Sequence, residues 1–284
     1  MQIYTCFSLL QNNSLKYLYY IFNKFVKMKF KYLFLLSFII LLSSCKAKLI
    51  DSYQVYSQND SNLKYRFFYP LKYDETKTYP LLVFLHGIGE RGSDNELQLK
   101  YIDEVIFDKI NRIDYPSFVL LPQSPKSDNW SSRKLVNKKI RQVFPIDDEP
   151  TRSLTLVMNL LDSLVNHRMI NDKKVYLSGL SNGGMGSFEL LKHRPNMFAS
   201  AVVICGGGNT EWAKEFSLTT PIWIAHGADD DVVVPEFSIN MVKAILENGG
   251  SPKFSLYENV GHDSWFNVFR DPNFLKWIFS HTKN

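Results

Sequence analysis

The sequence predicts a single α/β domain in which a mostly parallel, doubly wound sheet carries helices on both faces. From residue 50 onward, short apolar segments alternate with segments of helical periodicity, as in chains built from strand-helix-strand units. Most of the apolar segments are continuous, which is typical of strands buried on both faces of a parallel sheet. A length of 284 residues suits one large domain or two small ones, and no repeat or convincing linker divides the chain.

The individual elements follow from these patterns. Strands are expected at residues 65–68, 81–85, 118–121, 175–178, 201–205, 222–225 and 254–257. Helices are expected over 154–164 and between Pro235 and Gly249, because apolar residues recur there on one stripe. A further helix is expected over 185–193, where Pro195 stops it. Residues 125–150 are rich in Lys, Arg, Asp and Ser, and we interpret them as a loop insertion over one edge of the sheet.

Residues 28–44 predict a lipoprotein signal peptide. Lysines come first, followed by an apolar run too short to span a membrane comfortably and then by small residues. The stretch Leu42-Ser43-Ser44-Cys45 resembles the bacterial lipobox, in which the cysteine becomes the lipidated first residue of the mature protein. An ordinary signal peptide with an incidental cysteine is the alternative. The resemblance implies an exported protein, anchored by lipid at the bacterial cell envelope.

The remaining boundaries follow from this interpretation. Residues 1–27 precede the signal peptide and are interpreted as a misassigned upstream extension. Residues 45–59 are expected to be a short tether, and 60–284 the folded domain. Once Cys6 and Cys45 are set aside, only Cys205 remains, so the mature domain can form no internal disulfide.

The charge of the folded part is balanced. Residues 1–44 contain five lysines and no acid, so 28 of the 33 basic residues remain against 28 acidic ones. The formal charge of +5 therefore belongs to the N-terminal segment. A neutral domain gives no reason to expect a nucleic-acid partner.

The segment VYLSGLSNGGMG contains the candidate nucleophile, Ser181. Residues 179–183 match G-x-S-x-G, and the match lies after an expected strand and before an expected helix. A serine on such a tight turn projects its hydroxyl above the sheet, and the flanking glycines let strand and helix approach closely. A plain turn is the alternative, and the strand-turn-helix context favours a reactive serine.

A serine hydroxyl needs a base and a group that orients the base, and both follow downstream. HGADDDVVVP places Asp229, Asp230 and Asp231 at one strand end, and NVGHDSW places His262 after the last strand. The order Ser, Asp, His is that of the α/β-hydrolase fold. The acids could instead cap the following helix, and His262 could be a surface histidine. A metal site built from His86, His226 and His262 has no supporting spacing, so no metal is expected.

The oxyanion hole needs two backbone N–H groups aimed at the developing negative charge. Asn182, which follows the nucleophile, is expected to supply one. The loop HGIGERG is expected to supply the other, from Ile88 or, failing that, from Gly89. A simple glycine turn is the alternative for this loop.

Taken together, the segments resemble the esterase-like branch of the α/β-hydrolase superfamily, whose members include predicted peptidases, polyhydroxybutyrate-depolymerase-like and phospholipase/carboxylesterase-like hydrolases. The similarity spans about residues 60–280 and rests on YPLLVFLHGIGERGSDN, VLLPQSPKSDNW, VYLSGLSNGGMGSFEL, VICGGG, WIAHGADDDVVVP and GHDSWFNVF. It implies a triad of Ser181, an aspartate of 229–231 and His262. The family pattern H-G-x-x-D-x-x-V-P gives Asp230 when counted from His226 and Asp231 when counted back from Pro235. We favour Asp230, because the strand end fixes the His-Gly turn.

The expected activity is that of a serine carboxylesterase that needs no cofactor and acts on small esters or on acylated polysaccharide. A serine peptidase of the same fold is the second interpretation, and a non-catalytic binding lipoprotein the third. Trp130 and Trp265 are candidates for an acyl or sugar pocket, and burial in the core is equally compatible with their positions. The sequence leaves the oligomeric state open.

Overall fold

The computed structural model describes residues 51–58, 61–136, 141–146 and 149–283. The predicted signal peptide, the lipidation site Cys45 and the upstream extension lie outside these residues. Within the described part of the chain, no helix combines the length and the apolarity needed to cross a membrane.

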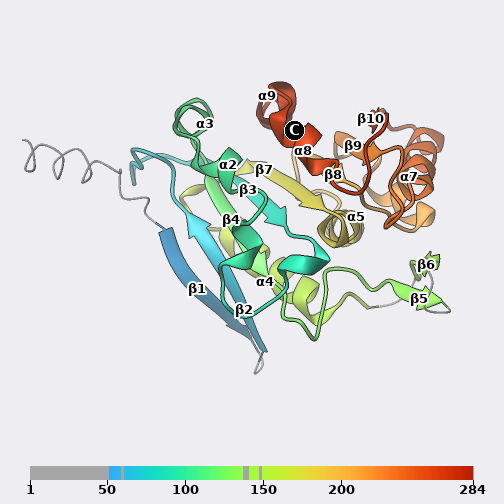
Figure 1. The fold of residues 1–284 in the computed structure, drawn as a ribbon. Helices are drawn as coiled ribbons and strands as arrows, with labels where there is room; N and C mark the ends of the chain where they lie inside the picture. Colours follow the sequence, from blue (N-terminus) through green and yellow to red (C-terminus); the bar gives the residue numbers. More distant parts are fainter. Residues whose placement is uncertain (1–50, 59–60, 137–140, 147–148, 284) are drawn as a thin grey trace, which may run out of the picture. The chain divides into compact units, whose positions relative to one another are not determined.

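A sheet of eight strands forms the centre of the domain, in the order β1-β2-β4-β3-β7-β8-β9-β10 (Figure 1). The strands are β1 (Asp51–Gln58), β2 (Ser61–Phe68), β3 (Tyr79–Leu85), β4 (Phe118–Gln123), β7 (Ile170–Leu180), β8 (Ser200–Ile204), β9 (Ile222–Gly227) and β10 (Lys253–Tyr257). β2 pairs antiparallel with β1 and β4, and every other pair is parallel. The predicted α/β fold with a mostly parallel sheet is therefore confirmed.

The N-terminal boundary of the domain differs from the prediction. Residues 51–58 were expected to belong to the tether 45–59, but they form β1, which pairs along its whole length with β2. An edge strand whose polar residues outnumber its apolar ones has no continuous apolar run, so the pattern that revealed the central strands did not reveal β1. The sheet therefore includes residues that the sequence assigned to the tether.

Helices cover both faces of the sheet (Figure 1). One layer comprises α4 (Arg152–Val165), α5 (Asn182–His193), α6 (Ala213–Phe216) and α7 (Glu236–Glu247). The opposite layer comprises α2 (Asp103–Phe107), α3 (Lys109–Asp114), α8 (Trp265–Arg270) and α9 (Asn273–Phe279). The three predicted helices are α4, α5 and α7, and the shorter helices were not predicted.

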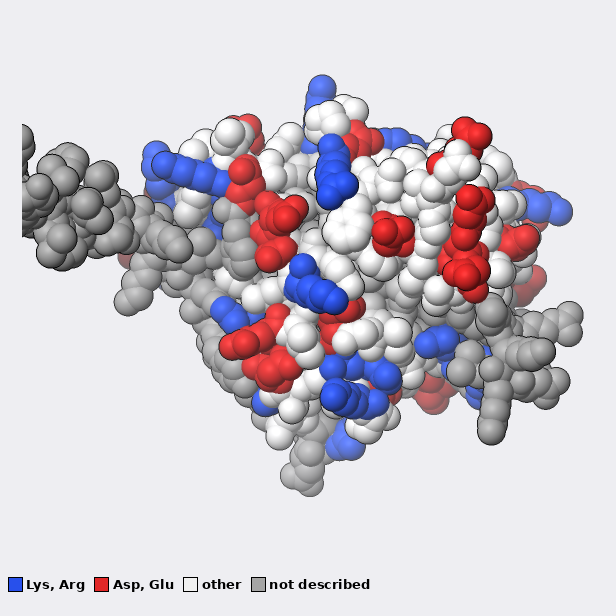
Figure 2. Space-filling model, in the orientation of Figure 1, with Lys and Arg blue, Asp and Glu red and all other residues white. Residues whose placement is uncertain are grey.

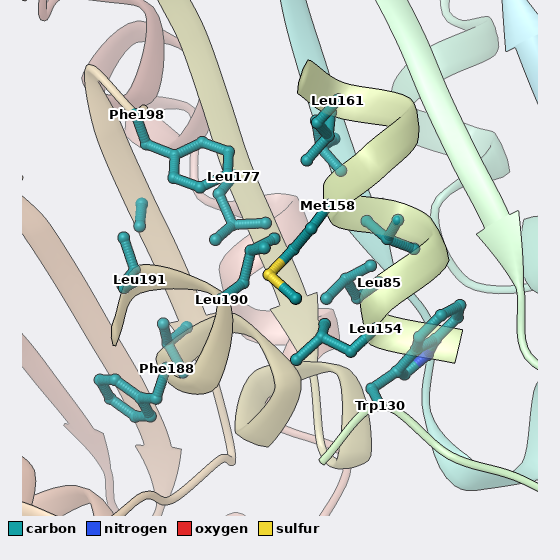
Figure 3. Close-up of a cluster of buried hydrophobic side chains, with 14 of the residues drawn as sticks. Leu85, Trp130, Leu154, Met158, Leu161, Leu177, Phe188, Leu190, Leu191 and Phe198 are labelled. Carbon is teal, nitrogen blue, oxygen red and sulfur yellow. The ribbon is translucent and has the colours of Figure 1, made fainter. Parts of the chain in front are cut away.

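Successive side chains of the central strands serve the two layers in turn, as the pleat of a strand requires. Val83 and Leu85 of β3 join the core beneath α4 and α5, whereas Phe84 packs against Phe269 of α8 at 6.1 Å between ring centroids. Figure 3 shows this core beneath α4 and α5, in which Leu154 of α4 points toward Leu85. Both layers bury large side chains, so the strands between them read as unbroken apolar runs.

The insertion at 125–150 is more ordered than a loop. It contains a separate antiparallel pair, β5 (Lys134–Val136) and β6 (Arg141–Val143). Near its C-terminal end, Phe144 lies against the helical layer: its ring packs on Trp212 and Phe237, and its carbonyl accepts a 2.7 Å hydrogen bond from Asn209 Nδ2. Strands this short and polar carry little periodic signal.

The connections place a topological switch point at the carboxyl ends of β3 and β7. These neighbouring strands are parallel, but the chain leaves β3 toward β4 on one side and leaves β7 toward β8 on the other. Loops that diverge in this way open a crevice beyond the carboxyl ends of the strands, where α/β folds bind their ligands.

Figure 2 shows acidic and basic side chains distributed together over the visible face of the domain.

Candidate active site

Ser181 lies on the sharp turn between β7 and α5. Its φ of 54° and ψ of −116° are unusual for a residue with a side chain and mark a strained backbone. The backbone N–H of Ser181 donates to Ile204 O at 2.8 Å, which ties the turn to β8. A Cβ on Gly183 would overlap the carbonyl of Leu85, so the turn requires glycine there. The predicted tight turn between strand and helix is thus present, and it holds Ser181 at the carboxyl end of β7.

His262 and Asp230 complete a hydrogen-bonded series with Ser181. His262 Nε2 lies 2.9 Å from Ser181 Oγ, and its Nδ1 lies 2.7 Å from Asp230 Oδ2. Because an ionised carboxylate only accepts, Nδ1 carries the proton and Nε2 is free to accept one from the serine. The residues come from the ends of β7, β9 and β10, and the structure brings together the three side chains that the sequence singled out.

Asp230, and not Asp231, faces His262. Asp230 is buried with 3% exposure, whereas Asp229 and Asp231 are exposed. Its Oδ1 accepts from the backbone N–H groups of Val232 and Val233 at 2.9 Å each. Burial would raise the pKa of Asp230, but hydrogen bonds to side chains and backbone N–H groups outweigh it and hold that pKa well below the usual range. The carboxylate is therefore ionised wherever the enzyme would work.

The loop after β3 passes beside the nucleophile and offers the expected oxyanion donor. A Cβ built on Gly87 would lie 3.7 Å from Ser181 Cβ. His86 Nδ1 donates to the Gly87 carbonyl at 2.6 Å, so the N–H of Ile88 on the same trans peptide points the opposite way. Among the described residues, neither this N–H nor that of Asn182 has a hydrogen-bond partner. Both N–H groups that the sequence predicted as donors are therefore free to bind a ligand atom.

A segment after β4, residues 126–130, connects the two halves of this site, and the sequence did not reveal its role. Arg91 donates from Nε to Ile88 O at 3.0 Å and from Nη1 to Lys126 O and Asp128 O at 3.1 Å each. On the other side, the side chain of Asn182 accepts from Trp130 N at 3.1 Å. One segment therefore braces the backbone of both donors.

The sequence also assigned no role in the site to His86. Its Nε2 accepts from the backbone N–H of Ser124 at 3.1 Å, and its Nδ1 donates to Gly87 O. Burial lowers the pKa of His86 to about 4, so the ring is neutral at pH 7. The neutral ring fixes the orientation of the peptide that carries the Ile88 N–H.

The two tryptophans occupy different environments. Trp130 is fully buried against Gly186 and His86, which makes it a core residue and not part of a pocket (Figure 3). Trp265 is 8% exposed and meets the His262 ring edge-on at 5.5 Å. Beside Trp265 lie Tyr101 and Phe266, which line a cavity of about 240 Å³ between the segment 100–111 and α8.

Within the described residues, one group of three side chains could offer ligands to a metal ion: atoms of Cys205, Asp230 and His262 lie within 4.8 Å of one another. Asp230 and His262 use these atoms to bind each other. Burial raises the pKa of the Cys205 thiol, and a protonated thiol is a poor ligand. The arrangement suits proton transfer between serine, histidine and carboxylate.

Comparison with known proteins agrees with this architecture. Residues 72–278 match the phospholipase/carboxylesterase family of the α/β-hydrolases. The match covers most of the chain, and the chain belongs to this family.

Individual relatives share different parts of their length with the chain. A bifunctional acetylxylan esterase/xylanase of Neocallimastix patriciarum is 31% identical over 102 residues, which are 36% of this chain and 14% of that protein. A carboxylesterase of Arabidopsis thaliana is 24% identical over 198 residues, 64% of this chain and 82% of that protein. The crystal structure of a thermostable esterase matches with a TM-score of 0.72 and 30% identity, over 82% of this chain and 63% of that one.

Proposed function

We propose that this protein is a serine carboxylic-ester hydrolase in which Ser181 is the nucleophile, His262 the general base and acid, and Asp230 the group that orients the base. The observation that carries the proposal is the hydrogen-bonded series from Ser181 Oγ through His262 to Asp230, which lies beyond the carboxyl ends of the central strands. Membership of the carboxylesterase family supports it.

The reaction proceeds in two halves. His262 Nε2 accepts the hydroxyl proton while Ser181 Oγ attacks the ester carbonyl, and the negative oxygen is stabilised by the N–H groups of Ile88 and Asn182. His262 then returns the proton to the leaving alcohol, and the acyl group remains on Ser181. In the second half, His262 deprotonates a water molecule, the resulting hydroxide attacks the acyl carbon, and Ser181 Oγ leaves with the proton.

Acylated polysaccharide, or small acetyl and feruloyl esters, is the substrate class that we propose. The similarity to a protein named as an acetylxylan esterase supports this class. The cavity beside Tyr101 and Phe266 supports it further, because aromatic rings next to polar side chains offer both stacking and hydrogen-bonding partners to a sugar. The cavity also adjoins Trp265, which contacts the catalytic histidine.

The substitution Ser181→Ala tests the nucleophile. We expect hydrolysis of p-nitrophenyl acetate to fall by at least about 10³-fold, while thermal unfolding stays close to that of the wild type. A serine-directed phosphonate should label the wild type and not the variant. Activity of the variant above a few per cent of wild type, with contamination excluded, would contradict the assignment.

A substrate panel tests the ester preference and the sugar-binding cavity. Acetylated xylan, feruloyl esters and chromogenic peptides separate an esterase from a peptidase of the same fold and from a protein without catalysis. Tyr101→Ala should raise KM for acetylated xylan and leave p-nitrophenyl acetate unaffected. Ile110→Ala, an exposed position on α3, is the matched control and should change neither.

We further propose that the protein is exported and held at the cell envelope by lipid on Cys45. The support is the order of lysines, apolar run and small residues before Cys45. Mass spectrometry of the native N-terminus should find a lipidated Cys45, and Cys45→Ser should release the protein from membranes. A native chain that still carries residues 1–27, or an unmodified soluble chain, would contradict this proposal.

A further inference from the structure

A second histidine contacts the triad aspartate. His226 is at the end of β9, four residues before Asp230, and both side chains are fully buried. Its Nε2 lies 3.1 Å from Asp230 Oδ2 and 2.7 Å from the carbonyl oxygen of Val233. Asp230 Oδ2 is also the oxygen that accepts from His262 Nδ1 at 2.7 Å. The carboxylate therefore stands between two imidazole rings.

The neighbours of His226 determine which of its nitrogens donates. Nε2 faces two oxygens, a carboxylate and a carbonyl, that can only accept, so it carries a proton. On the other side, Nδ1 lies 2.7 Å from Ser238 Oγ, and that hydroxyl lies 3.1 Å from Gly206 O. The hydrogen bond between Nδ1 and Ser238 Oγ can have its proton on either atom, and in both cases Nε2–H faces Asp230. The ring is thus held from α7 and from the loop after β8.

This contact completes the hydrogen bonding of the carboxylate. Oδ1 accepts from two backbone N–H groups, those of Val232 and Val233, and Oδ2 accepts from His226 and His262. Two oxygens with two acceptor sites each then have four donors, which fixes the plane of the carboxylate and its position relative to His262. A buried carboxylate that lost one of these donors would be held less firmly in this orientation.

We propose that His226 is a positioning residue of the active site. It donates from Nε2 to Asp230 Oδ2, aims the carboxylate at His262 and limits how strongly the carboxylate stabilises the His262 imidazolium. The inference rests on the proposed function, because its effect on turnover requires Ser181 and His262 to work as described. His226 touches neither substrate nor the reacting atoms. It acts only through Asp230.

The effect on basicity has a defined sign. A donor on Oδ2 withdraws negative charge from the oxygen that stabilises the His262 imidazolium. Without it, the carboxylate would stabilise the imidazolium form of His262 more strongly, and that form cannot accept the Ser181 proton. The titratable groups in this neighbourhood are Asp229, Asp230 and Asp231 on the turn after β9, His262 and Asp263 after β10, and Cys205 after β8.

The test compares His226→Leu with His226→Gln. Leucine removes the donor, whereas the glutamine amide can place an N–H near the position of Nε2. We expect His226→Leu to lower kcat for p-nitrophenyl acetate by about 10- to 100-fold with little change in KM, and to move the acid limb of the kcat/KM profile to higher pH. His226→Gln should recover most of kcat and return the limb toward its wild-type position.

A core variant controls for lost stability. Ile245→Ala, at a buried position of α7, should lower the melting temperature without changing kcat or the acid limb while the protein is folded. The proposal is overturned if His226→Leu keeps kcat within about twofold of wild type, because a positioning contact should cost more. It is also overturned if both variants lose activity equally with an unshifted limb, since His226 would then be only structural.

A spectroscopic measurement separates this inference from the proposed function. The proton of the His262–Asp230 hydrogen bond should give a far-downfield NMR resonance in folded protein, whether or not any ester is hydrolysed. His226→Leu should shift this resonance and His226→Gln should restore it. If the wild type hydrolyses no ester but the resonance shifts as described, the proposed function fails and the positioning contact stands. An unchanged resonance in a folded His226→Leu variant would overturn the contact.

Discussion

Two His-Gly turns at strand ends perform different tasks in this protein. His86-Gly87 follows β3 and His226-Gly227 ends β9, and both histidines are buried. His86 bonds only to backbone, donating to Gly87 O and accepting from Ser124 N, and so orients the peptide beside the nucleophile. His226 donates to a side chain, the carboxylate of Asp230. The same dipeptide thus holds the peptide that carries the Ile88 N–H at one strand end and contacts the carboxylate of Asp230 at the other.

The difference follows from what lies opposite each ring. At the first turn, the hydrogen-bond partners of the ring are the carbonyl of Gly87 and the N–H of Ser124, so a neutral imidazole with one donor and one acceptor satisfies both. At the second turn, an ionised carboxylate faces the ring and needs donors. A histidine before a glycine is therefore uninformative until its partners are known.

The largest expected effect comes from changing the partner of His226. Asp230→Asn replaces one carboxylate oxygen by an amide and removes the charge that stabilises the His262 imidazolium. We expect kcat to fall by on the order of 10³–10⁴-fold with KM nearly unchanged, measured with p-nitrophenyl acetate. Asp231→Asn, one residue along and exposed, is the matched control and should stay within about twofold of wild type, as surface changes usually do. The reverse pattern would move the acid to Asp231.

A smaller loss is expected at the other turn. His86→Leu leaves the Gly87 carbonyl without its donor, and the Ile88 N–H can then turn away from the oxyanion. Since loss of one oxyanion donor costs on the order of 10²–10³-fold, misorientation should lower kcat by about 10- to 100-fold. His86→Asn retains a short amide donor and should be less affected. The affinity for a phosphonate that mimics the tetrahedral intermediate should fall in parallel with kcat.

That measurement can also refute the role of His86. If His86→Leu lowers kcat without weakening the phosphonate, the ring does not act through the oxyanion donor. If neither quantity changes in the folded variant, the Ile88 peptide is held well enough by Arg91 alone, whose Nε donates to the next carbonyl, Ile88 O.

The fold was predictable because its central strands are continuous apolar runs and its longest helices show helical periodicity. Continuous apolar runs such as residues 81–85 and 201–205 are found only where both faces are buried, and they gave the central strands directly. The edge strand β1 and the pair β5–β6 escaped because the first is mostly polar, with no continuous apolar run, and the other two have three residues each. The short helices α8 and α9 escaped for a similar reason, since each has fewer than two full turns facing the core.

The candidate site was predictable to the extent that its chemistry lies in local motifs. Ser181, Asp230 and His262 stand at strand ends within short patterns, and the structure brings their reacting atoms within hydrogen-bonding distance. The supporting contacts join segments far apart in the chain, such as Arg91 with Asp128 and His86 with Ser124. No single-sequence pattern encodes such pairs, because each depends on how the loops after β3 and β4 pack together.

The last prediction concerns the His86 turn and the stability of the protein at low pH, where no effect on turnover at pH 7 is expected. Burial lowers the pKa of His86 to about 4, whereas an unfolded histidine titrates near 6.5. Between these values the unfolded chain binds a proton that native His86 does not, so the free energy of unfolding falls as pH drops from about 6.5 to about 4 and this loss levels off below. A difference of this size corresponds to about 3 kcal/mol.

Urea denaturation at pH 7 and pH 4.5 should show most of that loss in the wild type and much less of it in His86→Asn. Ile245→Ala should instead lower stability by the same amount at both pH values, because it removes no titratable group. If wild type and His86→Asn lose stability equally between the two pH values, the buried ring at the first turn does not titrate as burial requires, and its assignment as a neutral support for the oxyanion donor fails.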